Sequence, residues 1–458
     1  MAALILNLLW LSPVAAAGIA FTLTRRGLLT FTIGHGLFQL LLWVKLYLQR
    51  EAALQIPWSS LAGKTFHYAL AAQPSNLALL LLTIIVGHLA LYYGQREVGR
   101  VRSFSALFWL ALGFSQGVFL AKDVLLFFVF YEAALVPAFL LIYGWGGIRR
   151  KEAAVKFALF TLGGSVLFLV GMILALNSLP DSTYEAWASG GVSLAAWGLM
   201  TVGLAVKLPL FPLHSWLGEA HVEAATAVSM LLAGILLKLG GYALLQWVWF
   251  SLSSDLAWLL RIWGGVSLAY AAAVATGQID LKRLIAFTSI AHMALVAVGA
   301  GAQDERGLQG AYHQLFTHGL ISAGLFAWVG MVEKVLGSRR ITELRGSLAR
   351  QPFQAAILFF GAIGIPGSAL FVSEMMIVWG VAAGSGWSWA LIPASGVVLS
   401  AIYFLRTYRE LAAPTEKVFP PTLSLPPYQK LVWLLILLSV GVGIYPKLWL
   451  DLLAHVGR

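Results

Sequence analysis

Four ionisable side chains lie in the middle of long apolar stretches: Glu132, Lys207, Lys238 and Glu374. A charge at the centre of a bilayer costs about 2.5–3.5 kcal/mol on insertion scales, so residues kept there face a protein or water-filled interior and mark a transport path. Two charges of each sign on separate stretches exceed what packing requires. The pattern predicts a path for protons or sodium ions. The alternative is a structural ion pair between Glu132 and Lys207, with the other two paired to helix ends.

Helix breakers interrupt the two stretches that carry Lys207 and Glu374. They are Pro209 and Pro212 after the lysine, and Gly364, Pro366 and Gly367 before the glutamate. Proline removes a backbone donor and obstructs helical bonding. Freed backbone groups are tolerated in a membrane only inside protein or beside a wet cavity. A broken helix beside an ionisable group is typical of the ion site of an inverted-repeat transporter, and an ordinary proline kink is the alternative.

Histidines form a second set of candidates. His292 and His318 lie in apolar stretches, and an unperturbed pKa near 6.5 suits a group that relays protons. His313 lies between them in the sequence, and His214 and His221 lie near span ends, where a path could exit. For each histidine the alternative is a hydrogen-bonded core residue.

Lys122 and Asp123 precede the stretch that carries Glu132, and we interpret them as an interfacial pair. The alternative role of Asp123 is to orient the helix that carries Glu132. No group of His, Asp and Glu residues has the spacing of metal ligands, so no metal site is expected. No phosphate-binding glycine loop or dinucleotide motif occurs either.

Composition determines the class of protein. The chain is 60% hydrophobic and 11% charged, less than half of the roughly 25% charged residues of a soluble domain. The absence of cysteine excludes iron–sulfur clusters and thiolate chemistry within the chain. The net charge of +11 comes from basic residues in short loops, where they set topology. We therefore expect a membrane protein that binds no nucleic acid.

About fourteen apolar stretches are long enough to span a bilayer, which takes roughly 20 residues. They run over 4–23, 28–48, 74–93, 104–121, 124–145, 153–176, 194–216, 222–250, 256–276, 284–301, 310–335, 353–383, 389–408 and 430–450. Loops after odd-numbered spans are the more basic, which predicts that both termini face the non-cytoplasmic side. The predicted fold is an all-α, polytopic bundle.

The two breaks recur five spans apart, which predicts two five-helix repeats. The predicted regions are three N-terminal helices (1–103), a first repeat (104–250), a second repeat (251–409) and a C-terminal helix (410–458).

The segments AVKLPLFPLHSWLGEAHVEAATAVSMLLAGILLKLGGY, FVFYEAALVPAFLLIYGWGG, HQLFTHGLISAGLF and GIPGSALFVSE resemble the antiporter-like membrane subunits of respiratory complex I. Among these they are most similar to the subunit M (chain 4) group. The resemblance implies a fourteen-helix core with inverted repeats. Glu132 matches the fifth-helix glutamate, Lys207 the lysine of the broken seventh helix, and Lys238 the lysine of the eighth. Ala225 departs from the usual proline of this motif.

Glu374 matches the terminal residue on the broken twelfth helix. The resemblance implies glutamate there in subunit M, where related subunits and multi-subunit sodium/proton antiporters have lysine. The resemblance further implies that the partners of this chain are the other membrane-arm subunits and membrane lipids. NAD(P)H or ferredoxin, FMN, iron–sulfur clusters and quinone would belong to partner subunits, with no cofactor in this chain. The expected location is a bacterial inner membrane, with a thylakoid membrane as the alternative.

The expected activity is proton translocation, driven by redox chemistry in partner subunits. The negative charge of Glu132 would favour the protonated form of Lys207. If the pairing weakens, Lys207 would release its proton to Lys238, and onward through His292 or His318 toward Glu374. The alternatives are a subunit of a Mrp-type sodium/proton antiporter or membrane-bound hydrogenase, and a structural scaffold in such a complex.

Overall fold

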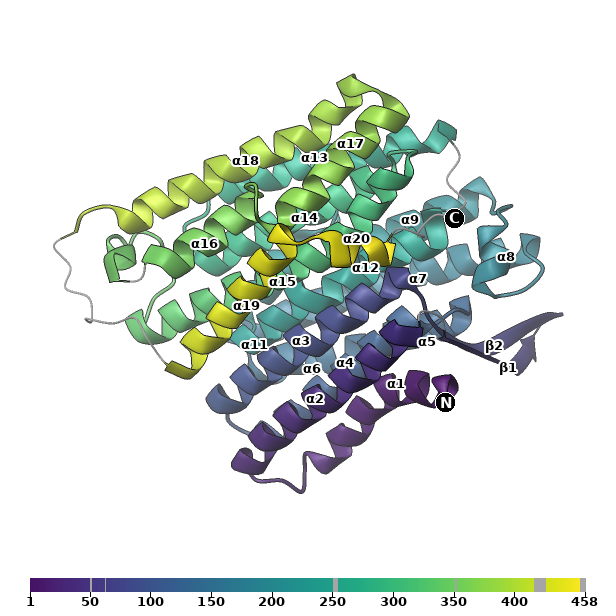
Figure 1. Cartoon of the computed structure of the whole chain (residues 1–458), viewed down its shortest axis with the longest axis horizontal. Helices are drawn as coiled ribbons and strands as arrows, with labels where there is room; N and C mark the ends of the chain where they lie inside the picture. The colour runs from purple at the N-terminus through teal and green to yellow at the C-terminus, as the bar shows by residue number, and fades with distance from the viewer. Residues whose placement is uncertain (50–51, 62, 250–253, 351, 416–425, 454–458) are drawn as a thin grey trace. The chain divides into compact units, whose positions relative to one another are not determined.

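A computed structural model gives the fold of the chain (Figure 1). It describes residues 1–49, 52–61, 63–249, 254–350, 352–415 and 426–453. Parts of the predicted spans and regions, among them residues 250–253, 416–425 and 454–458, lie outside the described residues. The described chain divides into two compact units, which do not follow the predicted region boundaries residue by residue. Unit 1 is Met1–Leu208, Glu223–Val228 and Ile235–Ser253, and unit 2 is the remainder.

Helices dominate the described residues, as predicted. Eleven of them are long and apolar enough to cross a membrane, and four shorter apolar helices accompany them. A membrane offers no water to backbone N–H and C=O groups, so apolar segments of this length satisfy those groups within a helix. The spans of Thr226–Val248 and α15 are wholly buried inside the protein, whereas most of α1, α2 and α18 faces outward with apolar side chains.

Unit 1 contains the N-terminal helices and most of the first predicted repeat, without Pro209–Val222 and Ser229–Gly234. Its elements are α1 (Ala2–Ile19), α2 (Arg25–Gln49), β1 (Ala52–Leu61), β2 (Lys64–Ala72), α3 (Pro74–Glu97), α4 (Val101–Leu120), α5 (Val124–Ala133), α6 (Leu135–Trp145), α7 (Arg150–Ser178), α8 (Tyr184–Ala188), α9 (Leu194–Lys207), α12 (Leu237–Ala243) and the π-helical η2 (Leu244–Val248).

Unit 2 contains the second predicted repeat, the C-terminal helices and the two remaining segments of the first predicted repeat. Its elements are α10 (Ser215–Glu223), α13 (Ser254–Thr276), α14 (Leu281–Ala300), α15 (Glu305–Leu336), the short 3-10 helix η4 (Ser347–Arg350), α16 (Pro352–Ile363), α17 (Ala369–Ser385), α18 (Trp387–Ala412), α19 (Pro426–Ile444) and α20 (Lys447–Leu453). Residues of α11 (Thr226–Leu231) and of the π-helical η1 (Leu232–Leu236) belong partly to each unit.

A β-hairpin is the feature that the all-α prediction did not contain. Strands β1 and β2 pair antiparallel from Ala52–Ala72 to Leu61–Lys64, with an irregularity between Pro57 and Ser59. The hairpin projects beyond the helix ends of unit 1 (Figure 1). It is tied to the loop before α8, because Ser182 Oγ donates a hydrogen bond to Thr65 O (3.0 Å).

Both predicted helix breaks are present. In the first, α9 ends at Lys207 and α10 begins at Ser215. In the second, α16 ends at Ile363 and α17 begins at Ala369. Prolines in each gap cannot continue helical hydrogen bonding, which explains why the helices stop there.

Candidate functional site

Lys207 is the last residue of α9, and its side chain is buried, with 5% of the residue exposed. Its Nζ donates a hydrogen bond to Tyr131 O (3.3 Å) and lies 3.4 Å from the centroid of the Tyr131 ring. The charge of Glu132 also acts on this lysine. The end of α9 is packed closely, since a Cβ on Gly240 would lie 2.9 Å from the Lys207 carbonyl carbon. The lysine is thus held at the helix break.

Glu132, on α5, is half-buried and does not form a direct ion pair with Lys207, although both belong to the described residues. Its carboxylate accepts a hydrogen bond from Ser165 Oγ on α7. The nearest partner of the ammonium group is the neighbouring residue Tyr131. The two side chains therefore form no direct ion pair, and the glutamate acts on the lysine across a gap. Whether their role is structural or in transport stays a prediction.

Lys238 is completely buried on α12. This helix lies between two π-helical turns, η1 and η2. Such turns are rare, and they are frequent at functional sites. Tyr242, one turn further along, donates a hydrogen bond from its hydroxyl to Phe119 O (3.0 Å). Glu132, Lys207 and Lys238 all belong to unit 1.

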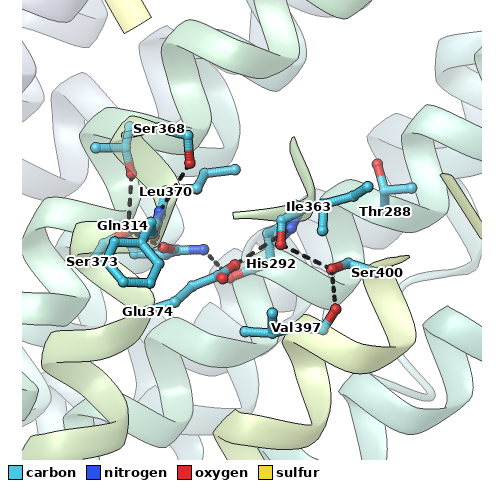
Figure 2. Close-up of polar contacts among 12 residues, drawn as sticks. Thr288, His292, Gln314, Ile363, Ser368, Leu370, Ser373, Glu374, Val397 and Ser400 are labelled. Carbon is cyan, nitrogen blue, oxygen red and sulfur yellow. Dashed lines mark hydrogen bonds and ion pairs between the residues drawn. The ribbon is translucent and has the colours of Figure 1, made fainter. Parts of the chain in front are cut away.

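Glu374 lies in unit 2, near the start of α17, and is 2% exposed (Figure 2). Its Oε1 is 3.7 Å from Nε2 of His292 on α14, a distance that becomes an ion pair when the histidine is protonated. Its Oε2 is buried and has no hydrogen-bond partner within the described part of the chain. Gly364 approaches this oxygen so closely that an added Cβ would lie 2.3 Å from it.

Polar side chains support the second break (Figure 2). Ser400 Oγ donates to Ile363 O (3.2 Å), the last carbonyl of α16. Ser368 caps α17 by accepting a hydrogen bond from Phe371 N (3.3 Å). Because these partners satisfy backbone groups that the break releases, the break is compatible with burial in a membrane protein.

Gln314 is a residue of this region that the sequence interpretation missed. Its Nε2 donates to His292 O (3.5 Å), and its Oε1 accepts a hydrogen bond from Ser373 Oγ. Thr317 Oγ1 lies 3.2 Å from the same serine hydroxyl. A glutamine within the apolar helix α15 was the available signal, because polar groups in a membrane interior require partners.

The predicted histidines are all buried in unit 2. The rings of His292 and His318 have centroids 5.4 Å apart, so the structure brings these two relay candidates together near Glu374. His313 is also buried, and its Nε2 has no hydrogen-bond partner among the described residues. His221 stacks on Phe326 at 4.5 Å.

His214 lies against the Tyr270 ring at 5.0 Å. Its burial and that of His221 place neither side chain at a visible surface of unit 2. Their role at an exit stays a prediction.

Asp123 caps α5 and is fully buried, and Lys122 Nζ has no hydrogen-bond partner among the described residues, so the two side chains do not pair with each other. Their position at the membrane interface stays a prediction. The aspartate accepts from the backbone N–H groups of Leu125 (2.9 Å) and His67 (2.8 Å), and from two further donors on Leu126 and Ser182. Burial raises the pKa of its carboxyl, and these hydrogen bonds oppose that effect. The alternative role holds: the aspartate fixes the start of the helix that carries Glu132.

A histidine pair in the N-terminal helices escaped the sequence interpretation. His35 Nδ1 lies 3.0 Å from His88 Nε2, and His35 Nε2 lies 3.1 Å from Ser12 Oγ. His88 Nδ1 lies 2.6 Å from Ile84 O, so that nitrogen carries the hydrogen and Nε2 accepts from His35. Gln39 continues the network by donating to Ser12 Oγ (2.7 Å). The network joins α1, α2 and α3 inside unit 1.

No group of three or more His, Asp and Glu residues suited to a metal ion occurs within the described ranges.

The chain matches one protein family and several known proteins over most of its length. The family described as NADH:quinone oxidoreductase/Mrp antiporter, TM, matches residues 121–402. The chain is 37% identical to an NAD(P)H-quinone oxidoreductase chain 4 of Synechococcus sp. (strain JA-3-3Ab), over 84% of this chain and 77% of that protein. It is 35% identical to NADH-quinone oxidoreductase subunit M of Rhodobacter capsulatus, over 84% and 80%.

The fold also matches a chain in the structure of respiratory complex I from Thermus thermophilus with bound NADH. The TM-score is 0.89 and the identity 26%, and the match covers 98% of each chain.

Proposed function

Since this chain belongs to the NADH:quinone oxidoreductase/Mrp antiporter family of transmembrane proteins, we propose that it carries protons across the membrane through buried Glu, Lys and His side chains. It is an antiporter-like membrane subunit of a complex I-type NADH- or NAD(P)H-quinone oxidoreductase, and its partners are other membrane-arm subunits. The chain has no cysteine to hold an iron–sulfur cluster. We assign NAD(P)H or ferredoxin, FMN, the clusters and quinone to partner subunits.

The observation that carries the proposal is the setting of Lys207. Its ammonium group is buried at a helix break, with one carbonyl and one aromatic ring as partners and Glu132 beyond them. Burial favours the neutral amine, whereas the glutamate favours the ammonium. A change of about 1.4 kcal/mol in this balance alters the ratio of the two forms tenfold. Small movements in neighbouring subunits can therefore load or unload a proton here.

The proposed order of carriers is Lys207, Lys238, then His292 or His318, and finally Glu374. At the last step, His292 Nε2 lies 3.7 Å from the Glu374 carboxylate, just beyond the range of roughly 2.6–3.2 Å for direct transfer, so a small movement of either side chain brings the two groups within reach. Each carrier accepts one proton before it releases one, so the carrier itself is unchanged after a cycle.

A shared local pattern supports the proposal of two five-helix repeats. Asp123 caps α5, and Asp280 caps α14. Each aspartate forms an isolated antiparallel bridge with a residue that follows the next long helix: Asp123 with Thr183, and Asp280 with Arg340. In the proposed repeats of 104–250 and 251–409, these aspartates occupy the same position at the start of the second helix.

The substitution Lys207→Ala tests the proposal, with Lys151→Ala on the exposed start of α7 as the matched control. Both variants are assembled into the native complex, and proton uptake by membrane vesicles is followed while quinone is reduced. We expect Lys207→Ala to lose most of its proton uptake while the subunit stays assembled, and the control to match the wild type. Undiminished uptake in Lys207→Ala would defeat the proposal and favour a scaffold.

A second candidate is sodium transport, as in a Mrp-type antiporter subunit or a membrane-bound hydrogenase. Glu374 argues for protons, because the resemblance implies lysine at this position in those antiporters. Replacing sodium with potassium in the same vesicles decides between the two ions. Unchanged pumping supports protons as the transported ion.

The chain is an integral, multi-pass membrane protein. We propose that it lies in a bacterial inner membrane, or in a thylakoid membrane, with both termini on the non-cytoplasmic side.

A further inference from the structure

Ser165 of α7 is a buried serine that the proposed path does not use. It is 5% exposed, and its hydroxyl donates a hydrogen bond to Oε1 of Glu132 on α5. A hydroxyl has a single hydrogen to donate, so this bond uses the whole donor capacity of the serine. A hydrogen bond to a charged acceptor is about twice as strong as one between neutral groups. Ser165 therefore sets the direction in which the Glu132 carboxylate points.

Phe168, three residues further along α7, contacts the neighbour of Glu132. Positions three apart lie on one face of a helix. The Phe168 ring is fully buried, and its centroid lies 6.1 Å from that of the Tyr131 ring. Tyr131 in turn supplies the carbonyl and the ring that contact the Lys207 ammonium group. One face of α7 thus holds both of the α5 residues that influence Lys207.

Glycines bring α7 into backbone contact with α9, the helix that ends at Lys207. A Cβ on Gly164, next to Ser165, would lie 2.7 Å from Gly203 O, and a Cβ on Gly203 would lie 2.5 Å from Gly164 O. Ordinary contact begins near 3.4 Å, so neither position accepts a side chain without a shift of the backbone. Gly203 precedes Lys207 by about one helical turn. The serine and the lysine are thus carried by two helices that are closely packed beside both residues.

The serine and the lysine are both donors for the same carboxylate. The Ser165 hydroxyl donates to Oε1 of Glu132. Lys207 instead donates to Tyr131 O (3.3 Å), and in the described part of the chain it forms no direct ion pair with Glu132. A direct ion pair would favour the ammonium form and hold the proton on the lysine. A carboxylate that stays on the serine therefore leaves the lysine able to give up its proton.

We propose that Ser165 is a positioning residue for proton release from Lys207, because its hydroxyl keeps the Glu132 carboxylate from pairing directly with the ammonium group. While the hydroxyl holds the carboxylate, an N–H bond of the ammonium breaks and the next carrier takes up the proton. When the hydroxyl lets go, the carboxylate pairs with the ammonium and the proton stays on the lysine. The serine itself neither gains nor loses a proton. This inference rests on the proposed function.

Thr161, one turn before Ser165 on α7, offers a matched control. It is also buried, at 3% exposed, but its hydroxyl donates to its own helix at Phe157 O (2.7 Å). Thr161→Val therefore removes a buried hydroxyl from the same helix and leaves the partner of Glu132 in place.

The test compares Ser165→Ala, Ser165→Thr and Thr161→Val in the assembled complex in vesicles. Alanine removes the hydroxyl at position 165, and threonine keeps it. The first readout is the rate of proton uptake per assembled subunit during quinone reduction. The second is the infrared band of the Glu132 carboxylate, identified by its loss in Glu132→Gln. That band responds to the donors on the carboxylate, so a serine that serves packing alone would leave it unchanged.

We expect Ser165→Ala to take up protons roughly tenfold more slowly, the order of effect produced by the loss of one hydrogen bond to a charged group. Its Glu132 band should shift, whereas Ser165→Thr and Thr161→Val should match the wild type in both readouts. A wild-type rate and band in Ser165→Ala would overturn the positioning role. Equal slowing in Thr161→Val would also overturn it, because the loss would then come from the packing of α7.

Ser165→Cys takes the place of the alanine variant if that variant does not assemble. Its thiol is a weak donor, so uptake should fall between the rates of the wild type and Lys207→Ala. A wild-type rate and band in Ser165→Cys would overturn the proposal.

Lys207→Ala separates this inference from the proposed function. If Lys207→Ala loses uptake and Ser165→Ala keeps it, only the positioning role fails. If neither variant changes uptake, the proposed function fails with it.

Discussion

Gly364→Ala should displace the Glu374 carboxylate without removing any ionisable group. Gly364 lies in the second helix break with φ of +80°, and a Cβ placed there would be 2.3 Å from Glu374 Oε2. Gly367, in the same break, has φ of +93° and nothing within 4 Å of an added Cβ. Gly367→Ala is therefore a matched control, since it carries the backbone strain alone.

The expected magnitudes distinguish the backbone strain, which both variants share, from the displacement of the Glu374 carboxylate, which only Gly364→Ala causes. A side chain at positive φ costs about 1–2 kcal/mol, and both variants bear this cost. Ordinary contact begins near 3.4 Å, so at Gly364 the carboxylate must move by the difference from 2.3 Å, which is 1.1 Å. A misplacement of about 1 Å can slow a reaction roughly a hundredfold. The carboxylate is the end of a flexible side chain, so it moves before the backbone does, and the subunit should still assemble.

The assay is proton uptake by vesicles during quinone reduction, normalised to the amount of assembled subunit. We expect Gly364→Ala to pump far more slowly than Gly367→Ala, while both lose a similar amount of thermal stability. Equal pumping by the two variants would refute the idea that the position of Glu374 limits proton transfer.

Two further predictions concern the joint between α4 and α5. Asp123→Ala removes a helix cap, at about 1 kcal/mol, and leaves the half-buried His67 N–H without its acceptor, at roughly 1–3 kcal/mol. The Ser182 hydroxyl keeps Thr65 O as an acceptor. The thermal midpoint of the purified complex should fall and less subunit should assemble, and an unchanged midpoint would contradict this. Lys122 has a folded pKa of about 7 against 10.5 in the unfolded chain, so between these values the unfolded chain binds more protons and stability rises with pH. Lys122→Met should flatten that rise in thermal midpoints measured from pH 7 to pH 10, and a persisting rise would assign it to other groups.

The sequence predicted the helical fold because a bilayer admits few other solutions for long apolar segments. Pro209 and Pro212 predicted the position of the first break, because proline cannot continue a helix. The hairpin Ala52–Ala72 was missed. It contains Pro57 and lies between two spans, so neither span length nor hydrophobic periodicity revealed it.

Side-chain partners were less predictable than positions. The charges of Glu132 and Lys207 suggested direct pairing, but the lysine contacts the backbone and ring of Tyr131. Which of two adjacent residues an ammonium group meets depends on helix rotation within a fraction of a turn, which sequence spacing does not define. His35 and His88 were overlooked because they lie 53 residues apart in the chain and meet only through packing.

Lys238 offers the most direct test of proton transfer through buried side chains, because it is completely buried. The measurement is the number of protons moved per electron pair by vesicles that contain Lys238→Met in the assembled complex. A proton-carrying lysine predicts a ratio well below that of the wild type at every pH between 6 and 9. A wild-type ratio at an unchanged rate would contradict it, and would leave these buried charges with a structural role.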